Sequence, residues 1–133
     1  KLFGENSFPE ADRFVALSAV GSSEEFISFF NICNRCFVES IENYGKSIGK
    51  SAYFWNDIKS SYPALFPILE RIKIYRHSED HLHLKPNVAQ KYAQFLREDT
   101  EGIEDIDTQR FCIQQRLLES FLTAIQVEIA NIT

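Results

Sequence analysis

The chain has 133 residues, which is long enough for one domain with a substantial core and too short for two. Apolar residues make up 44% of it and aromatic residues 14%, a content that excludes a disordered chain. The net charge of −5 argues against a protein that coats nucleic acid by bulk electrostatic attraction.

The cysteine count and the hydropathy pattern indicate a compartment. Three cysteines are an odd and sparse set, which argues against a disulfide framework and predicts a reducing, cytoplasmic environment. No apolar run approaches the roughly 18 residues that cross a bilayer, so we expect no membrane association. The sequence contains no Met, and we expect residues 1–133 to form a single domain that belongs to a longer protein.

The first predicted element is a long amphipathic helix over residues 23–44. It opens with a Ser followed by two Glu in the first turn, and Gly45 and Gly49 mark its end. Its apolar residues recur at intervals of three and four: Phe26, Phe30, Cys33, Phe37, Ile41 and Tyr44. The following "SAYFWNDI" is consistent with a short helix or a turn.

Prolines place the next two helices. One is predicted to begin near Pro67 and to run through Ile72 and Tyr75 toward the histidines, because proline suits only the first turn of a helix. Pro86 forbids continuation and begins another helix, whose apolar residues are Val88, Tyr92, Phe95 and Leu96.

The last predicted helix covers residues 107–132. Its apolar stripe, interrupted at Gln114, consists of Phe111, Leu118, Leu122, Ile125, Ile129 and Ile132. The sequence shows no strand pairs with turn signals. We therefore predict an all-α fold, an antiparallel bundle of about four to five helices.

Histidine and positive charge are concentrated in one region. All three histidines, His77, His81 and His83, fall within "IKIYRHSEDHLHL", where one predicted helix ends. The surrounding cations include Arg71, Lys73 and Lys85, to which we assign the binding of substrate phosphates. Carboxylates gather instead in a later segment, as Glu98, Asp99, Glu101, Glu104, Asp105 and Asp107.

Arg76 and His81 suit phosphate chemistry. A guanidinium stays charged and offers a planar fork of donors that matches phosphate oxygens. Imidazole, with an unperturbed pKa of about 6.5, can accept a proton from a ribose 2′-hydroxyl or donate one to a leaving oxygen. Because this pair needs no metal, the sequence predicts RNA scission without a cofactor.

"RHSEDH", residues 76–81, resembles the signature of the HEPN superfamily (higher eukaryotes and prokaryotes nucleotide-binding), in which an Arg, a polar residue and a later His end an apolar helix. The resemblance also covers the chain length and the helices around the motif. It implies a metal-independent endoribonuclease of the toxin or defence type, with Arg76 on phosphate, His81 as acid/base and His77 assisting. It further implies a homodimer with a composite cleft, and a cognate antitoxin or a fused or adjacent regulatory domain as partner.

Other interpretations use the same residues. The protein could be a non-catalytic helical module that binds RNA or dimerises within a larger protein. His77, His81 and His83 with Glu79 or Asp80 could instead hold a metal, or could simply carry favourable positive charge at a helix C-terminus.

Three further groups of residues carry smaller expectations. We interpret Cys33 and Cys36 as core or interface cysteines that behave as small apolar side chains, and Trp55 as a packing residue. We also expect the polar side of the first long helix to offer a supporting group to the cleft, from among Glu39, Ser40, Glu42 and Asn43.

Overall fold

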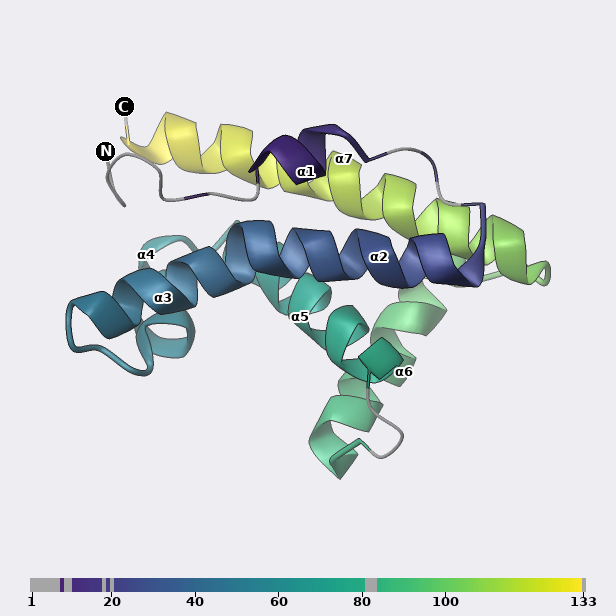
Figure 1. Cartoon of the computed structure of the whole chain (residues 1–133), viewed down its shortest axis with the longest axis horizontal. Helices are drawn as coiled ribbons and strands as arrows, with labels where there is room; N and C mark the ends of the chain where they lie inside the picture. The colour runs from purple at the N-terminus through teal and green to yellow at the C-terminus, as the bar shows by residue number, and fades with distance from the viewer. Residues whose placement is uncertain (1–7, 9–10, 18, 20, 81–83, 133) are drawn as a thin grey trace.

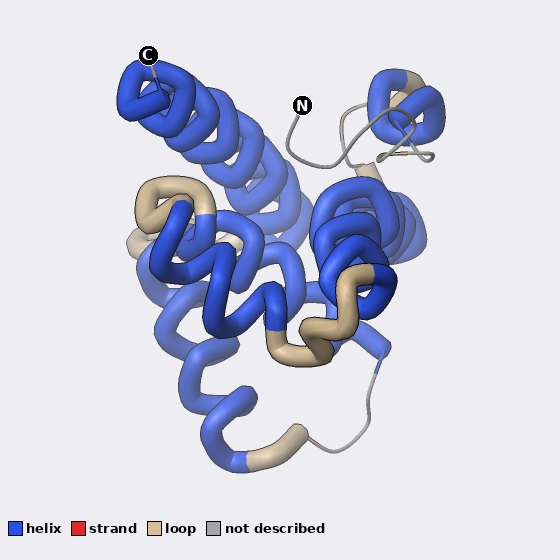
Figure 2. The backbone as a smooth tube through the Cα atoms, turned by 90° about the vertical axis from the view of Figure 1, so that its left-hand side faces the viewer, coloured by secondary structure: helices blue, strands red, loops and turns tan. Residues whose placement is uncertain are grey.

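The computed structural model describes residue 8 and residues 11–17, 19, 21–80 and 84–132, with the side chains of residues 79 and 80 left out. Across these residues the secondary structure consists of helices and loops without strands (Figure 2). The prediction of an all-α fold is therefore confirmed. Among the described helices, none is both long and apolar enough to cross a membrane.

The predicted first long helix is confirmed as a continuous helical run over residues 23–47. It consists of α2 (Ser23–Cys33), the π-helical η1 (Asn34–Glu39) and α3 (Ser40–Ser47). Ser22 begins it as N-cap, because its Oγ accepts the Glu25 N–H at 3.1 Å and donates to Glu25 Oε1 at 3.2 Å. Gly49 follows its end with a φ of 76°, a conformation in which a side chain is strained.

A short helical segment then folds back against the end of α3. The π-helical η2 (Phe54–Ile58) and α4 (Lys59–Ser61) form it. Gly45 allows Tyr53 to lie close to α3, since a Cβ at position 45 would collide with the Cβ of Tyr53 and crowd the carbonyl of Lys50. The segment "SAYFWNDI" thus contains the helix that was one of its two predicted forms.

The two proline-bounded helices form as predicted. They are α5 (Phe66–Asp80) and α6 (Pro86–Thr100), with Pro86 in the first turn of α6. Leu69, Ile72 and Tyr75 of α5 are buried in the core with Phe26, Phe29 and Phe30 of α2. The centre of the molecule is therefore a contact between α5 and the first long helix.

The helices are arranged around this centre (Figure 1). The short α1 (Ala11–Val15) and the long α7 (Ile106–Ile132) lie on one side of α2, and α5 and α6 lie on the other as a V-shaped pair. α5 and α6 lie at a steep angle to each other and α7 runs in the same direction as α2, so the antiparallel arrangement of the bundle stays a prediction.

The apolar stripe predicted on the last helix is largely exposed. Phe111, Leu118, Leu122, Ile129 and Ile132 are exposed, whereas the buried side of α7 is formed by Ile113, Gln114, Leu117, Ala124 and Glu128. The stripe is turned away from the core by about 100°, one residue step around an α-helix. It is therefore a surface feature of the single chain.

Glu128 explains why a carboxylate belongs to the buried side of α7. The residue is only 6% exposed, and its carboxylate contacts the segment just before α5. Its Oε1 accepts the backbone N–H of Ala64 at 2.7 Å and of Leu65 at 3.3 Å. Negative charge is favourable at a helix N-terminus, so this contact fastens α7 to α5.

Candidate functional site

The predicted motif lies at the C-terminal end of α5. Arg76 and His77 occupy its last turns and are both half-buried. His81 and His83 lie outside the described residues, as do the side chains of Glu79 and Asp80. Of the three predicted catalytic residues, the structure therefore places two.

A pocket of about 270 Å³ lies beside this end of α5, between η2 and the first turns of α6. Its lining combines cationic, aromatic and amide side chains with two aliphatic ones: Trp55, Lys73, Ile74, His77, Lys85, Asn87, Val88 and Lys91. We call it the Trp55 pocket. It brings together His77 with two of the three predicted substrate-binding residues, Lys73 and Lys85.

Local geometry explains why these cations converge. Lys73 and His77 are four residues apart on α5, and residues at this spacing share one face of a helix. Lys85 precedes Pro86 as the N-cap of α6 in an extended conformation, and Lys91 follows two turns later. The V formed by α5 and α6 therefore has positive charge on both of its arms.

Trp55 forms the aromatic wall. The wide π-helical turn of η2 buries Phe54 and leaves Trp55 42% exposed. Its ring meets Phe54 at 5.1 Å and 90° and Phe66 at 5.7 Å and 68°, so neither ring is stacked parallel on the indole. The ammonium groups of Lys73 and Lys91 each lie 6.0 Å from the indole centroid, at the outer limit of cation–π distance.

Two carboxylates hold two of the lysines in place. Lys73 Nζ lies 2.8 Å from Glu42 Oε1, and Lys91 Nζ lies 2.6 Å from Glu70 Oε2. Lys85 pairs with no carboxylate among the side chains that the structure describes. Glu42 is one of the four polar residues expected to support the cleft, and its ion pair holds Lys73 at the pocket.

Arg71 lies apart from the other predicted substrate-binding residues. It is two residues from Lys73, which puts the two side chains on nearly opposite faces of α5. Its guanidinium bonds Glu98 Oε2 at 2.6 Å and Asp99 Oδ2 at 3.3 Å, and it lies 4.1 Å from the Phe95 ring centroid. The structure gives this arginine a role in joining α5 to α6.

The Arg71 cluster also involves a buried tyrosine. Tyr75 is fully buried, and its hydroxyl donates to Asp99 Oδ2 at 2.6 Å. Burial, together with the hydrogen bond to that carboxylate, raises the pKa of Tyr75 well above its ordinary value. Glu98 and Asp99 thus pair with Arg71 of α5, and no residue of the acidic segment 98–107 lines the Trp55 pocket.

The cysteines behave as predicted. Cys33 and Cys36 are free and each only 1% exposed, so the interpretation as core cysteines is confirmed. Burial raises the pKa of the Cys33 thiol, which keeps it protonated and unreactive. Within the described part of the chain, no group of three or more His, Cys, Asp or Glu is placed to hold a metal; His81 and His83 fall outside that part.

Trp55, Asn87 and Lys91 also line the pocket, although the sequence did not indicate them as candidate site residues. Trp55 was interpreted as a packing residue because no interleaved basic pattern surrounds it in sequence; its basic neighbours come from α5 and α6 instead. One signal was available on α6, where Lys85, Val88 and Lys91 recur at intervals of three and therefore share a face.

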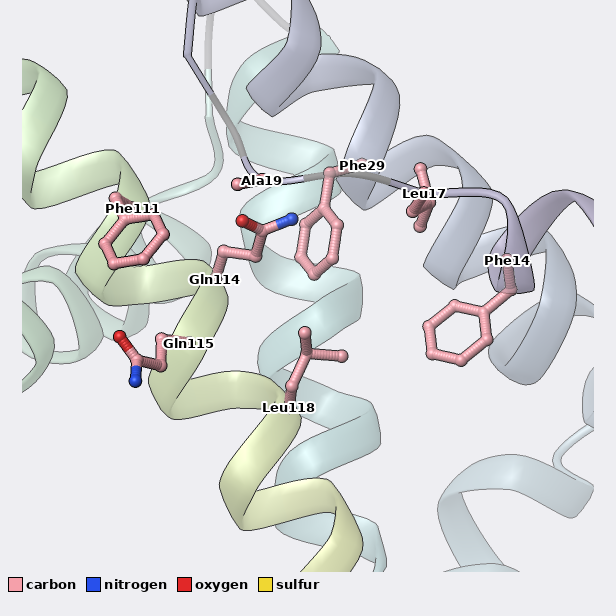
Figure 3. A pocket seen from close by; sticks show the side chains of 8 residues that line it. All are labelled: Phe14, Leu17, Ala19, Phe29, Phe111, Gln114, Gln115 and Leu118. Carbon is pink, nitrogen blue, oxygen red and sulfur yellow. The ribbon is translucent and has the colours of Figure 1, made fainter.

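A second pocket, of about 280 Å³, lies between α1, α2 and α7 (Figure 3). Its walls are mainly apolar side chains, with two glutamines from α7: Phe14, Leu17, Ala19, Phe29, Phe111, Gln114, Gln115 and Leu118. It contains no ionisable side chain, so it offers no acid, base or phosphate-binding group. It adjoins the exposed stripe of α7 through Phe111 and Leu118.

Comparison with protein-family models, with curated proteins and with solved structures found no match for this chain. Its resemblance to the HEPN superfamily therefore stays an expectation from the sequence of the motif, of which Arg76 and His77 lie in the last turns of α5.

Proposed function

We propose that the protein is a metal-independent endoribonuclease of the HEPN type. The observation that carries the proposal is the convergence of His77, Lys73, Lys85 and Lys91 on one pocket beside the motif, in a chain whose net charge is −5. A local positive site on an acidic protein concentrates a phosphate chain at one place instead of coating the whole surface.

The proposed chemistry is a transesterification within the RNA. The ribose 2′-oxygen loses its proton to an imidazole and attacks the adjacent phosphorus, while the bond from phosphorus to the 5′-oxygen breaks and that oxygen takes up a proton. The products are a 2′,3′-cyclic phosphate and a 5′-hydroxyl. We assign acid/base catalysis to His81, stabilisation of the charged phosphorane oxygens to Arg76, and substrate orientation to His77.

The proposal includes a homodimer. One protomer offers a single motif, and a two-fold pairing would bring a second Arg76 and a second set of histidines to the same cleft. We expect further partners of the kind that restrain a toxic nuclease, a cognate antitoxin or an attached regulatory domain.

The first prediction is cleavage of labelled RNA in excess EDTA. Because His81 supplies the proton transfers and Arg76 stabilises the charged phosphorane oxygens, His81→Ala or Arg76→Ala should lower the rate of cleavage by about 10²–10⁴. If the two residues act as a unit, the double variant should be little worse than the worse single one. His77→Asn should be milder, because Asn also orients a neighbour by hydrogen bonding.

The same experiment separates the alternatives. Loss of cleavage on adding EDTA would favour a metal site. RNA binding without cleavage under any condition would favour the non-catalytic module, an alternative that the exposed Trp55 in the pocket supports because tryptophan stacks on bases without performing chemistry. Equal loss in His77→Asn and His81→Ala would reassign the acid/base residue.

A further inference from the structure

The Trp55 pocket has the components of a nucleotide subsite, independent of which residue performs the cleavage. Proteins that hold single strands combine an aromatic surface for the base with cations that follow the phosphates. Here the exposed indole forms one wall, and the two arms of the α5–α6 V supply Lys73, Lys85 and Lys91.

The indole is available for stacking. It has edge-type contacts with Phe54 and Phe66, which fix the ring without occupying a parallel position on it. Two side chains that do not ionise, Asn87 and Val88, complete the lining on the α6 side. Asn87 can both donate and accept, so it suits the polar edge of a base.

The lysines retain capacity for a phosphate. Each ammonium has three N–H donors, and the ion pair with Glu42 or Glu70 occupies one of them in Lys73 or Lys91. These carboxylates also lower the local positive potential. Attraction between charges alone is therefore weak here, and a ligand needs an additional favourable contact. A base that stacks on Trp55 provides that additional gain.

We propose that the Trp55 pocket binds one nucleotide of a single-stranded RNA, with the base against Trp55 and the phosphate at Lys85, Lys73 and Lys91. The inference rests on the proposed function for its choice of RNA, and it names where the strand is held beside the motif. It makes Trp55 a binding residue, although it stands outside the motif in sequence.

The test uses the single Trp of the chain as its own reporter. A short oligo(dU) lacks the 2′-hydroxyl and cannot be cleaved by the proposed route, so binding is measured without turnover. Titration should quench the fluorescence of Trp55 in the full chain, and an oligomer of the same length with abasic sites should bind more weakly and quench little. Poly-glutamate should not compete.

Variants of the pocket residues test the subsite further, and their affinity is measured by the fluorescence anisotropy of labelled oligo(dU). Trp55→Ala should weaken binding roughly 5- to 100-fold, and Trp55→Phe should recover part of the loss because a ring is restored. Lys85→Gln should weaken binding and lower the slope of log K on log salt by about 0.7. Lys46→Gln, an equal change of charge on the last turn of α3 outside the pocket, should alter neither the affinity nor the slope.

A partner variant should act in the opposite direction. Glu70→Gln removes the carboxylate that holds Lys91 and should tighten binding. Equal binding of the abasic oligomer, an unchanged affinity in Trp55→Ala, or stronger binding of poly-glutamate would each overturn the subsite. Cleavage that depends on His81 but not on Trp55 would overturn the subsite alone, and binding through Trp55 without cleavage of RNA would overturn the nuclease alone.

Discussion

At the scale of single residues, one charged cluster decides how α5 meets α6. Asp99 is only 7% exposed, yet it accepts hydrogen bonds from Arg71 and from the hydroxyl of Tyr75. A carboxylate at such a depth is tolerable because its oxygens are satisfied. Arg71 therefore serves the fold, while Lys73, on nearly the opposite face of the same helix, faces the pocket.

The cluster predicts the effect of Tyr75→Phe. Loss of a buried hydrogen bond to a carboxylate should lower the free energy of unfolding by about 1.5–3 kcal/mol in urea denaturation at neutral pH. Tyr62→Phe is the matched control, since the structure describes no partner for its hydroxyl, and its effect should stay within about 0.5 kcal/mol.

The stability of wild type and that of Tyr75→Phe should also respond differently to alkaline pH. The unfolded chain releases the Tyr75 proton near pH 10, whereas the raised pKa keeps that proton on the folded chain, so this contribution to stability is complete below about pH 10 and falls above it. Tyr75→Phe lacks the fall, and the stability difference from wild type should narrow as pH rises past that value. A difference that stays constant with pH would contradict the raised pKa of the buried Tyr75 hydroxyl.

At the scale of elements, the sequence predicted where the helices lie along the chain, but it did not predict which face of α7 is buried. Ser22 with Glu25, Pro86 and Gly49 are local signals, and each bounds a helix as expected. The orientation of α7 depends on partners far away in sequence. Its periodic stripe contains the more apolar residues, but the N–H group of Ala64 needs an acceptor, and Glu128 on another side of α7 supplies it.

The same limit applies to the candidate site. The motif on α5 and its neighbouring lysines could be found in sequence, because they are close together along the chain. Trp55 could not, since its place beside Lys73 and Lys91 depends on the close approach of Tyr53 to Gly45 and on the packing of η2 against α5. The contacts that create the pocket join residues from three separate elements.

Glu128 allows a test of how α7 is fastened. Glu128→Ala leaves the backbone N–H of Ala64, near the start of α5, without its acceptor and should lower the free energy of unfolding by about 1–3 kcal/mol. Glu128→Gln keeps an acceptor oxygen without the charge and should cost less. Glu119→Ala, an exposed carboxylate on the same helix, is the control and should change stability by about 0.5 kcal/mol or less. Equal losses in Glu119→Ala and Glu128→Ala would contradict this role.

At the scale of the whole molecule, the apolar stripe of α7 is a prominent exposed surface among the residues that the structure describes. Leu122 is 58% exposed and Ile129 is 55% exposed, and the stripe from Phe111 to Ile132 extends for about 30 Å along the helix. A continuous apolar surface of this kind is typical of an interface between proteins. We expect a second copy of the chain to cover the stripe, as a prediction separate from the composite cleft, because the stripe lies on α7 and the motif lies on α5.

The expected homodimer can be tested with two substitutions on α7. Leu122→Glu places a charge in the stripe and, because a two-fold interface contains the position twice, should weaken association at least about tenfold. Val127→Glu is the matched control, since Val127 is also exposed but lies about 140° around the helix from Leu122. Light scattering at micromolar concentration should show dimers for wild type and Val127→Glu, and monomers for Leu122→Glu. Equal behaviour of the two variants would place the interface elsewhere, and a monomeric wild type with full activity would mean that each protomer holds a complete site.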